Sequence, residues 1–178
     1  TSDSGISDDD FILNTNVHSG FSVDGFAKQD FGGSDEAGWA VTQQSDGKYI
    51  VSGRVNGNVG LARYNQDGSV DTTFGSNGVV NETFTGDDYI FDVLVQVDGK
   101  IVVAGRDSGR GDYSITRFNS DGSIDLNFGE SGRAVQSILG WDRGYTLSIQ
   151  SDGKYLLAGN TSYSGSEDKV AIVRFNTD

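Results

Sequence analysis

Short apolar segments bounded by turn-forming residues occupy most of the chain. Three of them, which begin at Tyr49, Ile101 and Tyr155, read YIVSG, IVVAG and YLLAG, and each directly follows the tripeptide Asp-Gly-Lys. Asp-Gly is a strong signal for a β-hairpin turn because both residues tolerate positive φ. Strands that are almost wholly apolar are expected to be buried on both faces. Since no stretch has the helical period of about 3.6 residues, the pattern predicts an all-β protein.

The same unit is written three times along the chain. The stretch RYNQDGSVDTTFG at 63–75 returns as RFNSDGSIDLNFG at 117–129, and residues 174–178 begin it again. Repetition with a period of roughly 54 residues is typical of solenoids and propellers. Each unit has apolar segments for four short strands. We therefore expect three four-stranded antiparallel sheets that pack face to face, as the blades of a β-propeller do.

The middle unit indicates how the strands divide. Its strand candidates lie at 78–84, 89–96, 100–106 and 112–119. Applied to the whole chain, this division gives a leader followed by three blades. The predicted divisions are a leader at 1–20, which includes a candidate exchanged or edge strand at 11–17, and blades at 21–73, 74–127 and 128–178.

The repeated motif resembles a known family. In each unit Gln-x-Asp-Gly-Lys precedes an apolar strand that ends in Ala-Gly or Ser-Gly, and Arg-aromatic-Asn follows. In two units the motif continues as Asp-Gly-Ser-Val/Ile-Asp-x-x-Phe-Gly. Over 21–178 the pattern resembles the bacterial delta-sixty repeat family. The resemblance implies a β-propeller in a secreted or cell-surface protein, with more tandem copies than the three present here. It implies no activity, because the family is largely of unknown function.

Three blades of ordinary twist are too few to close a ring, because propellers typically have about 4 to 8. An open arc would leave apolar blade faces bare, which soluble proteins rarely tolerate. A dimer, a trimer, an open filament, or a longer parent protein of which this chain is a part would each cover those faces. Closed cyclic assemblies are the most frequent solution among oligomers. We therefore expect a homo-oligomer.

The charge of the chain narrows the set of partners. Asp and Glu number 26 against 13 Lys and Arg, which gives a net charge of −13. A field of that sign repels phosphate backbones and anionic lipid headgroups, so neither nucleic acid nor a membrane surface is an expected partner. No apolar run approaches the roughly 18 residues that a membrane-spanning helix requires. An acidic, glycine-rich chain without cysteine is consistent with an extracellular or cell-surface location.

Two acidic turns are candidate calcium sites. The sequences NQDGSVD and NSDGSID place oxygen-bearing side chains at alternate positions around a glycine, and Ca²⁺ binds several oxygens from one tight loop. Both sequences lack the bidentate Glu that closes an EF-hand. The alternative is a plain hairpin turn in which Asn and Asp bond to their own backbone. The candidate ligands are Asn65, Asp67 and Asp71 in the first turn and Asn119, Asp121 and Asp125 in the second.

Trp141 is the strongest candidate for contact with an organic ligand. It lies in the loop-like sequence LGWDRG and has no aromatic counterpart in the other units. It is the best candidate for an exposed stacking platform for a glycan or surface polymer, with Asp142 and Arg143 beside it; packing at the rim is the default interpretation. Another set of aromatics occupies one equivalent position in each unit and is interpreted as core between blades. Its members are Trp39, Phe91 and Tyr145.

Arginines recur within apolar strands, and a buried arginine needs an ion-pair partner. We expect Arg63 to pair with Asp71 and Arg117 with Asp125. A further acidic set occupies one place in each unit, where it could form a cation-attracting rim or simply carry solvated loop charges. This set consists of Asp35, Glu36, Asp87, Asp88 and Asp142.

No constellation of residues indicates catalysis. His18 is the single histidine, so a Ser-His-Asp triad or a histidine metal site would have to include it. It lies in the segment that resembles the repeat least. The sequence therefore favours a non-enzymatic module with a structural or adhesive, self-assembling role, whose partners are other copies of the chain. The alternative is a ligand-binding module, lectin-like or calcium-dependent, and calcium is the one cofactor considered.

Overall fold

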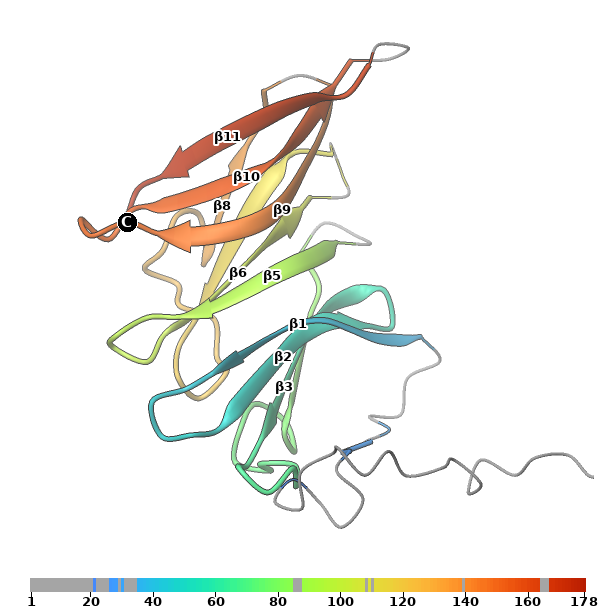
Figure 1. The fold of residues 1–178 in the computed structure, drawn as a ribbon, viewed down its shortest axis with the longest axis vertical. Coiled ribbons are helices and arrows are strands. Elements are labelled where there is room, and N and C mark those ends of the chain that lie inside the picture. Colours follow the sequence, from blue (N-terminus) through green and yellow to red (C-terminus); the bar gives the residue numbers. More distant parts are fainter. Residues whose placement is uncertain are drawn as a thin grey trace, which may run out of the picture.

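The computed structural model describes residues 21, 26–28, 30, 35–84, 88–107, 109, 111–138, 140–163 and 167–178. These residues form strands and turns, and among them there is no helix that could cross a membrane. Three antiparallel sheets are stacked along the long axis of the molecule (Figure 1). The all-β, blade-type fold expected from the sequence is confirmed. The leader at 1–20 and its strand at 11–17 lie outside the described residues.

Each sheet is an antiparallel meander of consecutive strands. The first sheet contains β1 (Glu36–Gln43), β2 (Tyr49–Val55), β3 (Asn58–Tyr64) and β4 (Val79–Glu82). The second contains β5 (Tyr89–Val95), β6 (Ile101–Arg106), β7 (Tyr113–Phe118) and β8 (Arg133–Gln136). The described residues of the third form β9 (Trp141–Ile149), β10 (Tyr155–Ser162) and β11 (Lys169–Phe175). The first strands of the three sheets are neighbours, because β5 contacts both β1 and β9 (Figure 1).

The Asp-Gly pairs form the hairpin turns that the sequence predicts. Gly47, Gly99 and Gly153 join the first two strands of the three sheets, and each has φ between 83° and 85°. In the first of these turns the carboxylate of Asp46 accepts a hydrogen bond from the backbone N–H of Lys48 at 3.1 Å. A positive φ at this position is the conformation that glycine tolerates without strain. Turn chemistry therefore fixes the register of β1 on β2 and of its two counterparts.

The fourth strand of each complete sheet lies beyond the expected boundary. The segment 78–84 was expected to begin the second blade, but β4 pairs with β3 in the first sheet, and β8 likewise pairs with β7. After β3 the chain turns back tightly, and the N–H of Arg63 donates to the carbonyl of Gly78 at 3.0 Å. The chain thus returns along the free edge of β3 before it crosses to the next sheet. The expected grouping of strands was wrong, and the units 21–73, 74–127 and 128–178 do not coincide with the sheets.

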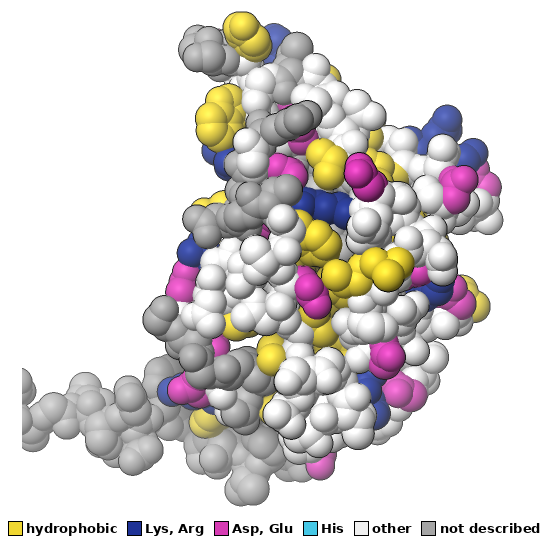
Figure 2. Space-filling view, turned by 180° about the vertical axis from the view of Figure 1, so that it is seen from behind, with side chains coloured by type: hydrophobic (Ala, Val, Ile, Leu, Met, Phe, Trp, Pro, Cys, Tyr) yellow, Lys and Arg dark blue, Asp and Glu magenta, His cyan; other side chains and the backbone are white. Residues whose placement is uncertain are grey.

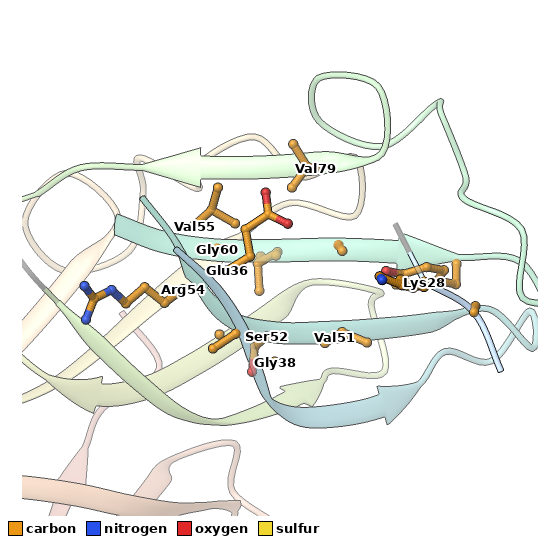
Figure 3. Close-up of a pocket in the computed structure, with 15 residues that line it drawn as sticks. Lys28, Glu36, Gly38, Val51, Ser52, Arg54, Val55, Gly60 and Val79 are labelled. Carbon is orange, nitrogen blue, oxygen red and sulfur yellow. The ribbon is translucent and has the colours of Figure 1, made fainter. Parts of the chain in front are cut away.

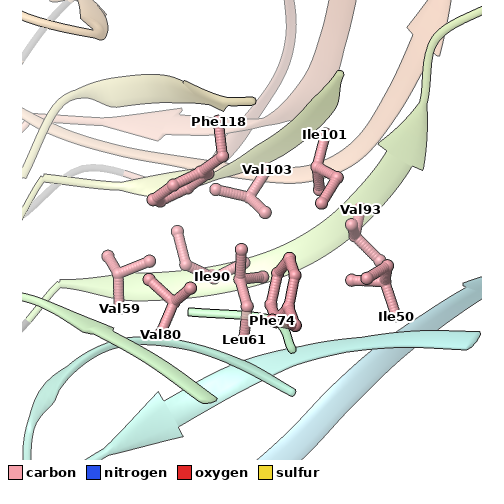
Figure 4. Close-up of a cluster of buried hydrophobic side chains, with 10 residues drawn as sticks. All are labelled: Ile50, Val59, Leu61, Phe74, Val80, Ile90, Val93, Ile101, Val103 and Phe118. Atoms are coloured by element: carbon pink, nitrogen blue, oxygen red, sulfur yellow. The ribbon is translucent and has the colours of Figure 1, made fainter. Parts of the chain in front are cut away.

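Apolar side chains fill the spaces between successive sheets. Between the first and second sheets they form a cluster that includes Ile50, Leu61, Ile101 and Phe118 (Figure 4). A second cluster, which includes Tyr113 and residues of the third sheet, fills the next space. The second sheet is buried on both faces, which agrees with the nearly continuous apolar sequence of β6. The core therefore lies between sheets, as in a stack of propeller blades.

Candidate functional site

The two candidate calcium turns contain buried ion pairs. Asp71 binds Arg63 Nε at 2.7 Å and Lys48 Nζ at 2.6 Å, and its side chain is almost fully buried. Asp125 repeats the arrangement with Arg117 and Lys100, both at 2.7 Å. The predicted pairing of Arg63 with Asp71 and of Arg117 with Asp125 is confirmed.

The pKa values of the two carboxyl groups follow from these contacts. Burial by itself would raise the pKa of Asp71, but hydrogen bonds from Lys48 and Thr73 hold it well below its ordinary value. The hydrogen bond from Lys100 is the main cause that lowers the pKa of Asp125, against an opposing effect of burial. Both groups are therefore ionised at neutral pH and satisfied by cationic side chains.

The remaining candidate ligands form Asx-type turns. Asp67 Oδ1 accepts hydrogen bonds from the N–H and the hydroxyl of Ser69, at 2.9 and 2.6 Å. Asp121 and Ser123 repeat these contacts, and Asn119 donates to the Ser123 hydroxyl as Asn65 does to that of Ser69. These bonds lower the pKa values of Asp67 and Asp121. Among the described residues no group of three or more acidic or histidine side chains could hold a metal ion. The geometry is that of hairpin turns, and Asp71 and Asp125 are held by cations rather than directed at a common point.

The residues predicted around Trp141 separate into exposed and buried ones. Trp141 and Arg143 are exposed on β9, whereas Asp142 is fully buried. Asp142 accepts a hydrogen bond from the N–H of Ile138 at 2.7 Å and another from the hydroxyl of Thr161. The assignment of Asp142 to a ligand site was wrong, because strand alternation turns every second side chain of β9 inward.

The described members of the acidic set do not form a cation-attracting rim. Asp35 pairs with Arg54, and Asp88 lies buried at 3.2 Å from Arg133. With Asp142 also buried, each of these carboxylates has a structural partner. On the face shown in Figure 2, acidic and basic side chains are dispersed rather than gathered by sign. His18 and Asp87 lie outside the described residues.

The aromatics interpreted as core instead form a surface row across the three sheets. Trp39 of β1 and Phe91 of β5 have ring centroids 5.8 Å apart, and Phe91 and Tyr145 of β9 are 5.2 Å apart. Tyr89 stacks beside both Trp39 and Phe91, at 6.0 and 6.2 Å. Trp39 and Tyr145 are 40% and 41% exposed, so the expectation that they are core was wrong. We call Trp39, Tyr89, Phe91, Tyr145 and Trp141 the aromatic row.

A β-bulge places one aromatic of the row in each sheet. In the first sheet Gly38 pairs with Gly53 and Ala40 pairs with Ser52, so Trp39 is left without a partner on β2. Phe91 on β5 and Tyr145 on β9 likewise have no partner on the neighbouring strand. A bulge of this kind re-aims the extra side chain, and bulges are frequent beside binding sites.

A glycine opposite each bulge makes room for it. A Cβ atom at Gly105 would lie 1.7 Å from the carbonyl oxygen of Tyr89, and at Gly53 or Gly159 it would lie 1.8 Å from the equivalent carbonyl. These glycines admit the bulged strand of their own sheet. The Gly at the end of each apolar strand was the signal in the sequence that could have revealed the bulges.

Arginine side chains extend the row to Trp141. The guanidinium of Arg106 lies 4.9 Å from the ring centroid of Trp141 and 5.8 Å from that of Tyr89. Arg54 lies 5.7 Å from the same Tyr89 ring. Distances below about 6 Å are those of cation–π contacts. Arg106 therefore bridges the rings of Tyr89 and Trp141.

The surface of the first sheet is hollowed. One depression of about 300 Å³ is lined by residues that include Lys28, Glu36 and Val51 (Figure 3). A neighbouring depression of about 480 Å³ is lined by apolar residues, among them Val41 and Tyr49.

Comparison with known protein families identifies the family of the chain. A family model described as "Domain of unknown function (DUF5122) beta-propeller" matches residues 44–74, 96–128 and 150–178, which together make up just over half of the sequence. The chain belongs to this family. No curated protein matches it. The matched segments of the DUF5122 propeller contain the hairpin turns and the buried Arg–Asp pairs, whereas every member of the aromatic row lies outside them.

Proposed function

We propose that this DUF5122 propeller chain is a non-enzymatic, secreted or cell-surface module with a structural and adhesive role, and that it assembles with copies of itself through its blade faces. The observation that carries the proposal is a pair of uncovered sheet faces. Each sheet has an N-face, which points toward the preceding sheet, and a C-face, which points toward the following one. Within the described residues, the N-face of the first sheet and the C-face of the third are without a neighbouring sheet.

The N-face of the first sheet has the composition of a buried surface. Val41 on this face is 65% exposed, whereas its counterparts Val93 and Leu147 are 6% and 8% exposed between sheets. The apolar depression of about 480 Å³ lies on this face, beside Tyr49 and Val51, and Phe21 and Ala27 from the segment before β1 also line it. A hollow apolar surface of this kind is suited to receive another apolar sheet.

The C-face of the third sheet is its complement. Val170 and Ile172 of β11 are 95% and 64% exposed, whereas Tyr113 and Ile115, their counterparts in the second sheet, are fully buried. Twice in this chain a C-face of this pattern packs against an N-face. Because the two uncovered faces repeat an arrangement that already exists inside the chain, the partner that fits both is a second copy, joined head to tail.

Sedimentation velocity of the 178-residue chain at micromolar concentration tests this proposal. The expected result is a particle larger than one chain, which the substitution Ile172→Asp reduces to a monomer, since the charge would be buried in the joint. Val97→Asp is the matched control, because Val97 is fully exposed on a hairpin turn away from both faces. A monomer for the unsubstituted chain, or equal effects of the two substitutions, contradicts the proposal.

Ligand binding is the second candidate function, favoured by the exposure of Trp141 and Arg143 on β9. The calcium-dependent form of this function has weaker support, since Asp71 and Asp125 are engaged by Arg and Lys side chains. Isothermal titration of Ca²⁺ into the protein tests the calcium-dependent form directly. Saturable binding that is lost in the Asp67→Asn and Asp121→Asn variants would support it.

A further inference from the structure

We propose that the aromatic row is a binding site for a neutral polysaccharide, with pyranose units stacked on its exposed rings. This inference goes beyond self-assembly, because the row shares no residue with Val41, Val170 and Ile172, on which the assembly proposal rests. Trp39 and Tyr145 are 40% and 41% exposed, and Trp141 is 51% exposed. Large aromatic side chains at this degree of exposure, grouped across three sheets, mark an interaction surface rather than a core.

The backbone around the row is fixed in advance of any ligand. Bulges at Trp39, Phe91 and Tyr145 aim one ring from each sheet at the same surface. The Asp92 carboxylate accepts a hydrogen bond from the backbone N–H of Leu147 at 2.7 Å, which ties β5 to β9 beside the row. A site held by strands rather than by loops loses little conformational freedom on binding.

Arg106 supplies a polar group at the same surface. Its guanidinium lies between the rings of Tyr89 and Trp141. No salt bridge of Arg106 is found among the described residues, whereas Arg54, which also lies near the Tyr89 ring, is paired with Asp35. The hydroxyl oxygens of a sugar are acceptors that the N–H donors of a guanidinium can bind.

Charge and ring access select the ligand class. The net charge of −13 repels polyanions such as nucleic acids and sulfated or uronic-acid polymers. Organic cations are disfavoured at Tyr89, because Arg54 and Arg106 already lie over that ring. A neutral pyranose satisfies both conditions, since it presents C–H groups to an aromatic ring and hydroxyl groups to Arg106. The length of the row across three sheets fits a chain of sugars rather than a single one.

The two tryptophans of the chain make the test direct. Trp39 and Trp141 are the only two in the sequence and both belong to the row, so intrinsic tryptophan emission reports on the row alone. We expect the emission to shift on titration with at least one of xyloglucan, mixed-linkage β-glucan, galactomannan or pullulan, and acrylamide quenching to decrease. Alginate and chondroitin sulfate serve as polyanionic probes, and they are expected to leave the emission unchanged.

Affinity electrophoresis in gels that contain the responding polymer measures the contribution of each ring. Tyr145→Ala and Trp39→Ala are expected to weaken binding by about tenfold or more, as loss of a central aromatic contact does. Leu126→Ala is the control, because Leu126 is 70% exposed and lies outside the row. The proposal is overturned if none of the four neutral polymers binds, if the polyanions bind instead, or if the Tyr145→Ala and Leu126→Ala variants bind equally. Sedimentation of the same variants separates this result from the assembly proposal, since substitutions in the row are expected to leave particle size unchanged.

Discussion

Arg63 Nη1 donates a hydrogen bond to the carbonyl oxygen of Ser120 at 2.8 Å, which joins the first sheet to a turn of the second. Arg117 makes the same contact with the carbonyl of Thr177, also at 2.8 Å. Each arginine forms a salt bridge with its Asp partner and lies over the ring of a phenylalanine, Phe74 or Phe128. The recurring arginine therefore acts as a clamp from one sheet to the next.

The clamp predicts different effects for arginines at equivalent positions. Arg117→Gln is expected to lower the free energy of unfolding by about 3 kcal/mol, because it leaves Asp125 buried beside Lys100 alone and frees the carbonyl of Thr177. Arg174 is the matched control, since it occupies the same position on the third sheet but is exposed. Arg174→Gln is expected to change stability by less than about 0.5 kcal/mol. Urea denaturation measures both, and equal losses would show that the clamp does not stabilise the stack.

The glycine opposite each bulge leads to a second prediction, which compares the stability effects of two Gly→Ala substitutions. Gly105→Ala is expected to destabilise the protein by about 2 kcal/mol, because the new Cβ would lie 1.7 Å from a backbone carbonyl that cannot move without loss of the bulge. Gly140→Ala is the control, since its nearest neighbour would be 3.5 Å away. Thermal unfolding compares the two variants. A stable Gly105→Ala variant would mean that the bulge at Phe91 is dispensable.

Acid is expected to weaken the stack of sheets through Asp71 and Asp125. Their folded pKa values lie below the ordinary 3.8, so the unfolded chain binds more protons than the folded one in acid. The stabilisation is complete above the unfolded pKa and is lost as pH falls from about 5 through the folded values. Each carboxyl group can contribute at most about 1.4 kcal/mol per pH unit to this slope.

Urea denaturation at several pH values between about 3 and 6 measures this dependence. Asp71→Asn removes one of the two carboxyl groups and is expected to flatten the curve while it lowers stability at neutral pH. Asp152→Asn is the control, because Asp152 is exposed on a turn and makes its ion pair with the neighbouring Lys154. A curve for Asp71→Asn that is as steep as that of the unsubstituted chain would assign the acid sensitivity to other groups.

Local chemistry in the sequence was sufficient for the hairpins and for the buried ion pairs. Asp-Gly strongly favours a turn, and an arginine buried in an apolar strand needs a carboxylate, so the turn at Gly47 and the Arg63–Asp71 pair could be predicted. The position of β4 could not be predicted in the same way. Whether a strand joins the preceding or the following sheet depends on how the chain turns after β3, which the apolar pattern does not encode.

The aromatic row could not be predicted for a related reason. An aromatic residue in a strand is usually buried, and Trp39 is directed outward because a bulge interrupts the alternation of β1. The prediction for Asp142 was wrong in the opposite direction. A carboxylate next to an exposed tryptophan was assumed to be exposed too, but Asp142 is buried. In both cases the sequence did not show which side chains of the strand point inward and which point outward. The recurring glycine that allows the bulge is present in the sequence, but its effect appears only when β2 and β1 are paired.

Complementation between two variants would establish the direction of self-assembly. If copies join head to tail, Val41→Asp damages the N-face of the first sheet and leaves the C-face of the third intact, and Ile172→Asp does the reverse. Each variant alone is expected to be monomeric. Mixed in equal amounts they retain one intact joint, between the C-face of the Val41→Asp chain and the N-face of the Ile172→Asp chain, and should form a heterodimer that cannot grow further. Native mass spectrometry of the mixture, with one chain isotope-labelled, identifies that species. A joint in which each face meets its own copy would give the opposite pattern: each variant would still dimerise through its undamaged face.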